Sequence, residues 1–462
     1  MPALKYWTLT IAMFTALWCY AALSPALANA EPSFTRYFAN LPFRETPFSP
    51  LVGTHAITEK EAKTRKHFRF EYDAQGRPIR VAFMQGEKIV GLNDNANYYF
   101  FAPKLEISYG ENTETRVFFD KHDNRIAVTG DVFREVYQLD ERGYRRSLEF
   151  FNHHGDPVEN SWGVARYEWT LLNDGEVIEK RFNFKNELQE LRSGFPFYEV
   201  RFHYGPDGWL ALMQNYGHEG RLTLNDLNAA QDRLDYAANG DLLSWNVLDE
   251  NGKPSSGNGP GVARGILERN EYGYDVVERY ENEHGEPIKN AYGWSYSYST
   301  YDRFGNYVDR TNYALDRKTL LKVDNRGYAG YAYTYDRHGR NRLLITFFDE
   351  DRLPARREGR GYYAIRSVYD NNDNEIETRF EMAHGKLINR QDTGFAIVKR
   401  TFDSRGRLIQ MSYHNAADEL VNHRGTGIAI EEYFYGDYGI SLSTTRYASD
   451  GAKFEESLFN EP

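Results

Sequence analysis

Cysteine is almost absent from this chain of 462 residues, and the single one is Cys19. It lies in an apolar stretch, residues 7–23, that precedes the small-residue triplet 28–30. This layout predicts a secretory signal peptide over residues 1–30, cleaved before Glu31, with an uncleaved membrane anchor as the alternative. The mature protein is therefore expected to be periplasmic or secreted, with no disulfide and no thiolate chemistry.

Positive charge is also scarce, because 56 Lys and Arg face 67 Asp and Glu, for a net charge of -11. The only charged residue of the leader is Lys5, so its removal lowers the net charge to -12. An acidic chain without a basic stripe repels phosphate backbones, which argues against nucleic acid as a partner. No second long apolar run follows the leader, so we expect no membrane insertion after its removal.

Short catalytic motifs are missing as well. The chain has no Gly-x-Ser-x-Gly elbow, no phosphate-binding glycine loop and no His-Glu-x-x-His zinc motif. Four histidines, at 122, 154, 284 and 384, recur at one turn position, but they are too far apart to share an ion. We therefore predict no metal and no cofactor. Carboxylate pairs for glycoside hydrolysis stay an open alternative, because 67 acids offer many pairs and only distance selects one.

What the chain does contain is a turn that returns every 32 to 34 residues. Asp373 takes the place of glycine in the tenth of the twelve copies. The turn glycines are Gly76, Gly110, Gly143, Gly175, Gly208, Gly240, Gly273, Gly305, Gly339, Gly406 and Gly439. A fixed period of this size indicates one supersecondary unit copied along the chain, each copy burying its apolar face against its neighbours.

The residues around each turn indicate strands. A Tyr or Phe stands four residues before the turn glycine in most copies, and apolar residues stand three and seven residues after it. Charged residues fill the positions between, which is the alternation of a half-buried antiparallel strand. A second turn follows twelve residues later, as at Gly285 and Gly385. The expected fold is all-β: an elongated antiparallel β-repeat, a solenoid or spiral sheet, of about twelve units of ~33 residues.

Two stretches depart from the repeat. Residues 31–67 lack the turn motif and contain a helix-capping box at Thr58–Glu61, so we interpret them as an N-terminal cap over the first sheet edge. Residues 221–235 carry leucines near helical spacing and suggest a short helix or an irregular excursion. The repeat array is expected over residues 68–455, followed by a C-terminal tail, 456–462.

The Tyr-Asp-x-x-Gly turns at Tyr72, Tyr301 and Tyr335, with Phe402 in a fourth, resemble the YD repeats of the RHS-repeat family. The resemblance covers residues 68 to about 455 and implies a long spiralling β-sheet, which in that family often forms a hollow shell. The period here is longer than the typical family repeat by one extra turn per unit. A self-cleaving core segment and a variable C-terminal toxin are not recognisable, so no toxin-delivery role is carried over.

Aromatic residues make up 15% of the chain and supply the binding hypothesis. Two clusters alternate rings with small residues, which places several rings on one face of a strand. These candidate ligand-binding residues are Tyr292, Trp294, Tyr296, Tyr298, Tyr328, Tyr331 and Tyr333. If exposed, such rings suit stacking on sugars or contact with a protein, and if buried they form the core between repeats.

The pattern therefore favours a binding or scaffold protein without a catalytic step, which presents an aromatic surface to a cell-envelope polysaccharide or a protein partner. The alternatives are a polysaccharide-degrading enzyme of the cell envelope and a shell-like accessory protein of a toxin or secretion system.

Overall fold

The computed structural model describes residues 31–92, 102–172, 175–191, 197–217, 220–323, 326–436, 441–454 and 457–458. Its strands form one antiparallel sheet of 28 strands. One short helix, α1 (Glu59–Ala62), accompanies them in this part of the chain.

The first fifteen strands are β1 (Phe34–Asn40), β2 (Thr54–Ile57), β3 (Lys66–Tyr72), β4 (Pro78–Gln85), β5 (Lys88–Ile89), β6 (Lys104–Tyr109), β7 (Thr113–Phe119), β8 (Arg134–Leu139), β9 (Arg145–Phe151), β10 (Arg166–Leu171), β11 (Glu176–Phe182), β12 (Glu199–Tyr204), β13 (Leu210–Tyr216), β14 (Gln231–Tyr236) and β15 (Leu242–Leu248). The remaining strands are β16 (Arg264–Arg269), β17 (Asp275–Glu281), β18 (Tyr296–Tyr301), β19 (Tyr307–Tyr313), β20 (Gly330–Tyr335), β21 (Arg342–Phe348), β22 (Ala364–Tyr369), β23 (Glu375–Glu381), β24 (Ile397–Phe402), β25 (Leu408–His414), β26 (Ile430–Tyr435), β27 (Ser441–Tyr447) and β28 (Ser457–Leu458).

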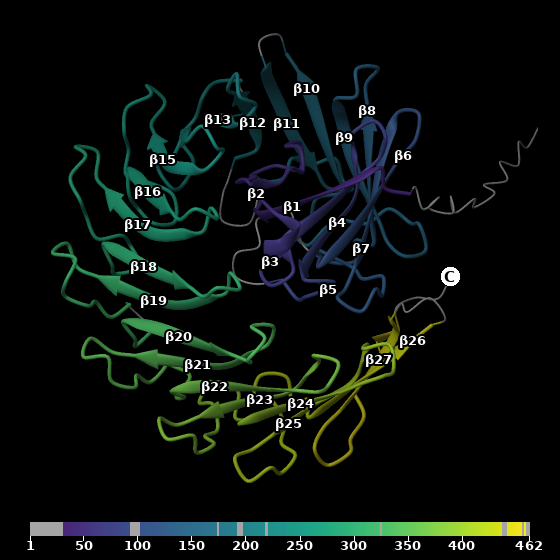
Figure 1. The fold of residues 1–462 in the computed structure, drawn as a ribbon, viewed down its shortest axis with the longest axis vertical. Coiled ribbons are helices and arrows are strands. Elements are labelled where there is room, and N and C mark those ends of the chain that lie inside the picture. Colours follow the sequence, from purple (N-terminus) through teal and green to yellow (C-terminus); the bar gives the residue numbers. More distant parts are fainter. Residues whose placement is uncertain are drawn as a thin grey trace, which may run out of the picture.

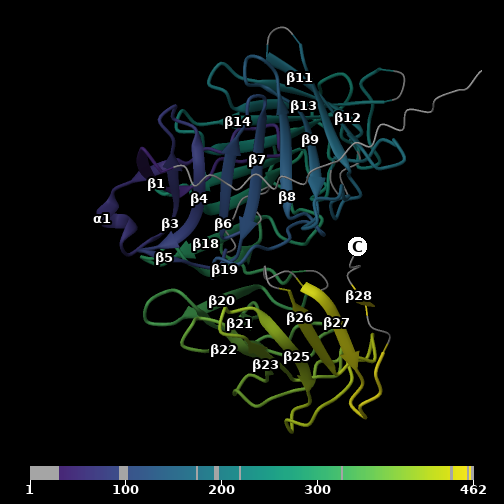
Figure 2. The same cartoon turned by 90° about the vertical axis from the view of Figure 1, so that its right-hand side faces the viewer.

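The sheet winds into a spiral (Figure 1). From β7 onward each strand pairs with the one before it in sequence, whereas β6 pairs with β4 and β7, and β1 pairs with both β2 and β3. We call β1–β15 the first coil and β16–β28 the second coil, because separate core clusters lie behind them. Figure 2 shows β20–β28 below the first coil. The predicted all-β repeat architecture is confirmed.

The recurring turn has the predicted chemistry. In the turn before β19, Asp302 Oδ1 accepts hydrogen bonds from the backbone amides of Phe304 at 2.8 Å and Asn306 at 2.9 Å. Gly305 closes the turn at φ +84°, in the left-handed region that glycine enters without steric cost. Asp373 takes the same conformation, at φ +63°, in the copy that lacks glycine.

Tyrosine is preferred four residues before the turn glycine because its hydroxyl ties one repeat to the one before it. Tyr301 donates to the main-chain oxygen of Asp275, and Tyr335 donates to that of Tyr307, both at 3.0 Å. Tyr369 and Tyr435 make the matching bond in their copies. In the second copy Tyr109, which directly precedes Gly110, donates to Pro78 O, and Gly110 lacks the positive φ of the other turn glycines that the structure describes. Equivalent rings lie two strands apart, about 10 Å, and so do not stack directly on one another.

A β-bulge beside the turn explains the curl of the sheet. Register shifts occur at the last residue of the first strand in many hairpins, for example between Thr300 and Tyr301 and between Val368 and Tyr369. An extra residue on one strand bends it and increases its twist. Because the bulge recurs at the same place in successive copies, the bends add up to a coil.

The second coil stacks on the first through turn residues. Lys66 N donates to Phe304 O at 2.8 Å, which joins β3 to a turn seven repeats later. Further bonds across this junction run from Asn40 to Gly273 O (2.7 Å), from Gln85 to His338 O (2.7 Å) and from Asn124 to Arg405 O (2.9 Å). One edge of the first coil is therefore covered by the turns of the second coil.

Two local predictions can be compared with the structure. The capping box at Thr58 and Glu61 is confirmed, with both reciprocal hydrogen bonds present at the start of α1. The helix suggested for residues 221–235 is wrong, because the stretch contains a turn closed by Asn225 followed by strand β14. The leucine spacing there arises from a loop and a strand joined in sequence, which together imitate a helical period.

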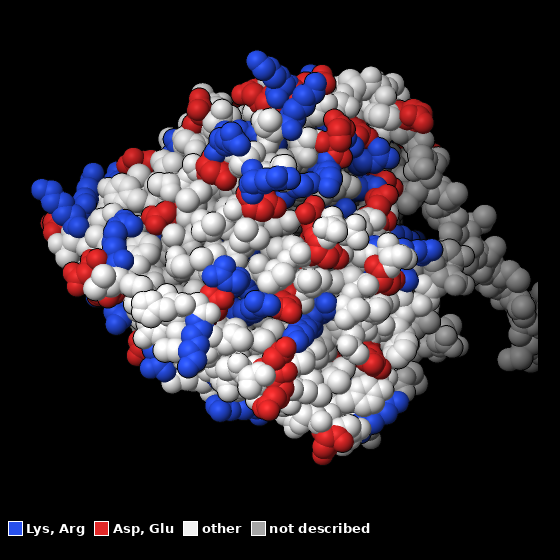
Figure 3. Space-filling view, turned by 60° about the horizontal axis from the view of Figure 1, so that its bottom comes forward, with Lys and Arg blue, Asp and Glu red and all other residues white. Residues whose placement is uncertain are grey.

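The surface carries both signs of charge. In the view of Figure 3, basic and acidic side chains are interspersed among uncharged residues. No helix in the described part of the chain has the length and apolar composition needed to cross a membrane.

Candidate functional site

One face of the sheet lines the interior of the first coil, and we call it the inner face. In the β10–β11 hairpin, Tyr167 lies opposite Arg181 and Trp169 opposite Glu179. All four side chains are at most 2% exposed. Equivalent positions of the neighbouring hairpins belong to the same core cluster: Tyr137, Leu148, Val200, Phe202, Met213, Leu234 and Val247.

A segment from before the repeats fills the first coil. Residues 41–51, which we call the plug segment, connect β1 to β2, and Leu41 and Leu51 join the core cluster. The Phe48 ring lies 5.6 Å from that of Trp169 and 5.9 Å from that of Tyr204, centroid to centroid. The residues expected only to cap the sheet edge thus also occupy its interior, while β1 extends the edge beside β3.

Arg145 on β9 holds the backbone of the plug segment. Its Nη1 donates to three consecutive main-chain oxygens, those of Pro47 (2.6 Å), Phe48 (3.1 Å) and Ser49 (3.1 Å). Its Nη2 bonds both carboxylate oxygens of Glu114 at 2.9 Å. These residues form a turn, in which Ser49 N donates to Thr46 O at 3.3 Å. The contact recognises the main chain of that turn, since an arginine can bond carbonyl oxygens whatever side chains their residues carry.

A buried carboxylate completes the contact with the plug segment. Glu179 accepts hydrogen bonds from Trp169 Nε1 at 2.7 Å, from Arg181 Nη1 at 2.6 Å and from the hydroxyl of Thr46. The Glu179 and Arg181 side chains are both 0% exposed. Arg181 Nη2 also donates to Phe197 O at 2.6 Å, so hydrogen bonds from and to other groups support the buried Glu179–Arg181 ion pair.

The charges around Arg145 give the fold a specific acid sensitivity. Burial alone would raise the pKa of Glu114, but Arg116 and Arg145 outweigh it and lower that pKa to about 2. A carboxyl whose pKa is lower in the folded state stabilises the fold above its unfolded pKa of 4.5 and loses that contribution as the pH falls toward 2.

We therefore expect the free energy of unfolding to fall between about pH 5 and pH 2, with a contribution from Glu114 of at most about 1.4 kcal/mol per pH unit. Urea denaturation at several pH values measures this slope. In Glu114→Gln the slope should be shallower over the same window. An unchanged slope would show that Glu114 is not the group responsible.

On the second coil the inner face is less covered. Residues that lie opposite each other on paired strands point to the same face of the sheet. Such pairs trace the inner face from the first coil into the second, for example through Ile345, which lies opposite Ile365 on the next hairpin. Phe347, Phe380 and Val398 on this face are buried, near one edge. Its central residues are half-buried, unlike their fully buried counterparts in the first coil: Tyr331, Tyr333, Ile345, Ile365, Met411 and Tyr433.

The aromatic residues of this face contact one another across strands. The Tyr331 ring lies 6.0 Å from that of Tyr307 and 5.3 Å from that of Tyr333. Tyr307 is also 5.8 Å from Tyr333, so the three rings form a cluster over β19 and β20. Burial raises the pKa of Tyr307, which keeps its phenol neutral.

The seven rings singled out from the sequence do not share one surface. Tyr331 and Tyr333 are on the inner face, whereas Tyr296 and Tyr298 lie opposite Tyr313 and Thr311 on the outer face. Their exposures are 42% for Tyr292, 8% for Trp294, 3% for Tyr296 and 4% for Tyr328, and Tyr298, Tyr331 and Tyr333 are half-buried. Trp294 and Tyr328 serve as core. Ligand binding by this set stays a prediction.

Two features of the site escaped sequence reasoning. Neither the plug segment nor its contact residue Arg145 stands out by motif, since the contact joins residues 96 to 98 positions apart. A third turn in each unit, such as the one from Asn290 to Gly293, was also missed. Its signal was present, because a glycine recurs 20 to 22 residues after the first turn at 163, 293, 327, 361, 394 and 427.

No protein-family model and no curated protein matches the chain. Among solved structures, TcdB2-TccC3 without its hypervariable C-terminal region is similar over 85% of this chain, with 13% identity and a TM-score of 0.35. The Photorhabdus luminescens Tc holotoxin pore is similar over 84%, with 11% identity and a TM-score of 0.32. The chain covers 19% of each of those chains. These values do not establish a shared activity, and the β-repeat architecture described above rests on the strand pairings themselves.

Proposed function

We propose that the protein is a binding scaffold whose second coil holds a segment of a partner protein on its inner face. The observation that carries this proposal is the plug segment. In the first coil, the inner face binds this non-repeat stretch of the same chain through ring contacts and main-chain carbonyls. The second coil repeats the same architecture, and its central inner-face residues are only half-buried.

The residues that grip the plug segment have counterparts in the second coil. Arg145 pairs across its turn with Leu139, and Arg342 pairs with Tyr335 at the corresponding place. The Arg145 guanidinium lies 4.4 Å from the centre of the Tyr137 ring, and that of Arg342 lies 4.6 Å from the Tyr333 ring. An arginine held over a tyrosine ring in this way is oriented to donate hydrogen bonds to backbone carbonyl oxygens.

The composition of this face suits a protein segment. Half-buried Tyr, Ile and Met side chains dominate it, and such residues supply most of the binding energy at protein interfaces. Charged residues also lie on this face: Arg310, opposite Tyr331, pairs with Glu278 at 2.7 Å, and Arg400 lies opposite Met411. We assign the face no catalytic step.

A random peptide library displayed on phage tests the proposal. We expect panning to enrich peptides that carry aromatic residues, because Phe48 is the ring through which the plug segment contacts the inner face. Tyr333→Ala should weaken their binding roughly 30-fold, the loss of a hot-spot contact of about 2 kcal/mol. Arg342→Gln should weaken it by roughly 10-fold or more, because Gln cannot place several donors on the carbonyls.

The matched control is Thr334→Ala, since Thr334 is the exposed neighbour of Tyr333 and points to the outer face. Its affinity for the selected peptides should not change. Equal binding by Tyr333→Ala and Thr334→Ala would contradict the proposal. Binding to an array of cell-envelope glycans, with no enriched peptide, would instead support a polysaccharide partner.

A further inference from the structure

A pocket of about 450 Å³ lies where the two coils meet. The β5 hairpin and the turn containing Lys121 form its first-coil wall. Its second-coil wall contains Arg340 and the turn with Asp373. These residues lie at strand ends, not on the inner face, so the pocket is independent of the proposed peptide site. Pockets of this size hold small molecules.

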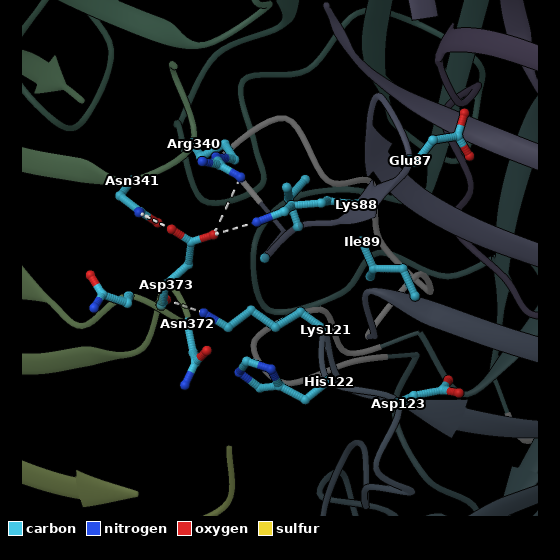
Figure 4. Close-up of a pocket in the computed structure, with 13 residues that line it drawn as sticks. Glu87, Lys88, Ile89, Lys121, His122, Asp123, Arg340, Asn341, Asn372 and Asp373 are labelled. Atoms are coloured by element: carbon cyan, nitrogen blue, oxygen red, sulfur yellow. Dashed lines mark hydrogen bonds and ion pairs between the residues drawn. The ribbon is translucent and has the colours of Figure 1, made fainter. Parts of the chain in front are cut away.

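Three cations converge on one residue, Asp373, in this pocket, as Figure 4 shows. Lys88 Nζ lies 3.8 Å and Arg340 Nη1 lies 3.6 Å from Asp373 Oδ2. Lys121 Nζ donates to the main-chain oxygen of Asp373. The cations come from both coils, so their positions depend on the coils being stacked.

The donors of these cations are incompletely used. Separations of 3.6 and 3.8 Å exceed the length of a hydrogen bond, so Lys88 and Arg340 are attracted to Asp373 without bonding it. The closer partner of the carboxylate is Asn341, whose Nδ2 donates to Oδ1 at 2.7 Å. Arg340 Nε is buried and makes no hydrogen bond within the described residues.

The other two carboxylates of the pocket wall serve cations elsewhere. Glu87 pairs with Arg69 at 3.7 Å, and Asp123 pairs with Lys104 at 2.5 Å. Figure 4 shows both pointing away from Asp373. Burial lowers the pKa of Lys121, and nearby acids, Asp373 first among them, offset part of that lowering.

We propose that this pocket binds a phosphate group, either free phosphate or a small phosphomonoester, held by Lys88, Lys121 and Arg340. A phosphate presents several acceptor oxygens and up to two negative charges, which suit two ammonium groups and a guanidinium from different directions. Asp373 occupies the position of the turn glycine in the other copies and competes with the ligand for the same cations.

Isothermal titration calorimetry of the full chain tests the site, with inorganic phosphate and glycerol 3-phosphate as separate probes at constant ionic strength in chloride. We expect saturable binding, at least 10-fold weaker in Lys121→Met. Asp373→Gly should bind at least 10-fold more tightly, since it removes the competing carboxylate and restores the glycine of the other copies. The probe that binds more tightly shows whether the pocket prefers free phosphate or a phosphomonoester.

Lys386→Met is the control, because Lys386 is an exposed turn lysine outside the pocket and its loss should leave the affinity unchanged. Should Lys121→Met fail to fold, Lys88→Met replaces it, since the Lys88 side chain is 61% exposed. If Asp373→Gly loses stability and binds neither probe, the cluster is only a clasp between coils and the proposal is overturned. Equal affinities for Lys121→Met and Lys386→Met would overturn it as well.

Discussion

Glu179→Ala should lower the free energy of unfolding by about 3–5 kcal/mol, because it leaves Arg181 buried without a counter-ion. The Arg181 side chain is 0% exposed and cannot reach water for compensation. Trp169 Nε1 and the Thr46 hydroxyl lose their acceptor at the same time, so the plug segment loses one of its hydrogen bonds to the inner face. Urea denaturation followed by tryptophan fluorescence measures the loss, and the midpoint is the appropriate readout for a repeat array that need not unfold in two states.

A matched pair is available as a control. Arg166 and Glu168 form an ion pair with the same spacing of two residues, but their side chains are 28% and 48% exposed. Glu168→Ala should therefore lower the free energy of unfolding by less than about 1 kcal/mol. A double replacement, Glu179→Leu with Arg181→Met, should regain most of the stability, since apolar residues of similar volume can replace a buried pair. Equal costs for Glu179→Ala and Glu168→Ala would contradict this account.

The repeat could be predicted from sequence because its determinants are local. Turn glycines, the aspartate three residues before them and the alternation of apolar residues all act within a few positions, as Asp302 and Gly305 illustrate. Local signals set the hairpins, and the bulge beside each turn bends them into a coil. How many copies complete one turn of the coil depends on summed small bends, which no single residue encodes.

Predicting the candidate site from the sequence requires two kinds of information. Which face a ring occupies follows from its distance to the turn glycine, because side chains alternate along a strand. Tyr331 stands eight residues before Gly339 and Tyr296 nine residues before Gly305, so their opposite faces were readable in principle. The plug segment was not readable, because residues 41–51 carry no repeat and their partners are distant in sequence. Its three prolines, Pro42, Pro47 and Pro50, indicate irregular chain but do not indicate which surface it packs against.

Gly406→Ala should destabilise the junction between the coils by about 2–4 kcal/mol. Part of this is the cost of a side chain in the left-handed region, since Gly406 has φ +75°. The rest is steric, because a Cβ at this position would lie 2.4 Å from the His122 ring of the first coil. His122 cannot easily move aside, because its Nε2 is hydrogen-bonded to Asn374 Oδ1 at 2.6 Å. Urea denaturation gives the total, and hydrogen exchange in β24 and β25 locates it.

Gly143→Ala separates the two contributions. Gly143 occupies the same turn position at φ +83°, but a Cβ there would meet no atom within 4 Å. Gly143→Ala should therefore lower the free energy of unfolding only by the conformational contribution, about 1–2 kcal/mol. Adding His122→Ala to Gly406→Ala should remove most of the steric contribution to the destabilisation. Adding His122→Ala to Gly143→Ala should change the free energy of unfolding only by the effect of His122→Ala alone. Equal destabilisation by the two glycine variants would mean that the coils do not press on each other at this turn. The stacking of coil on coil then could not depend on the missing Cβ, and its stability would have to come from hydrogen bonds such as those of Lys66 N and Asn124 Nδ2.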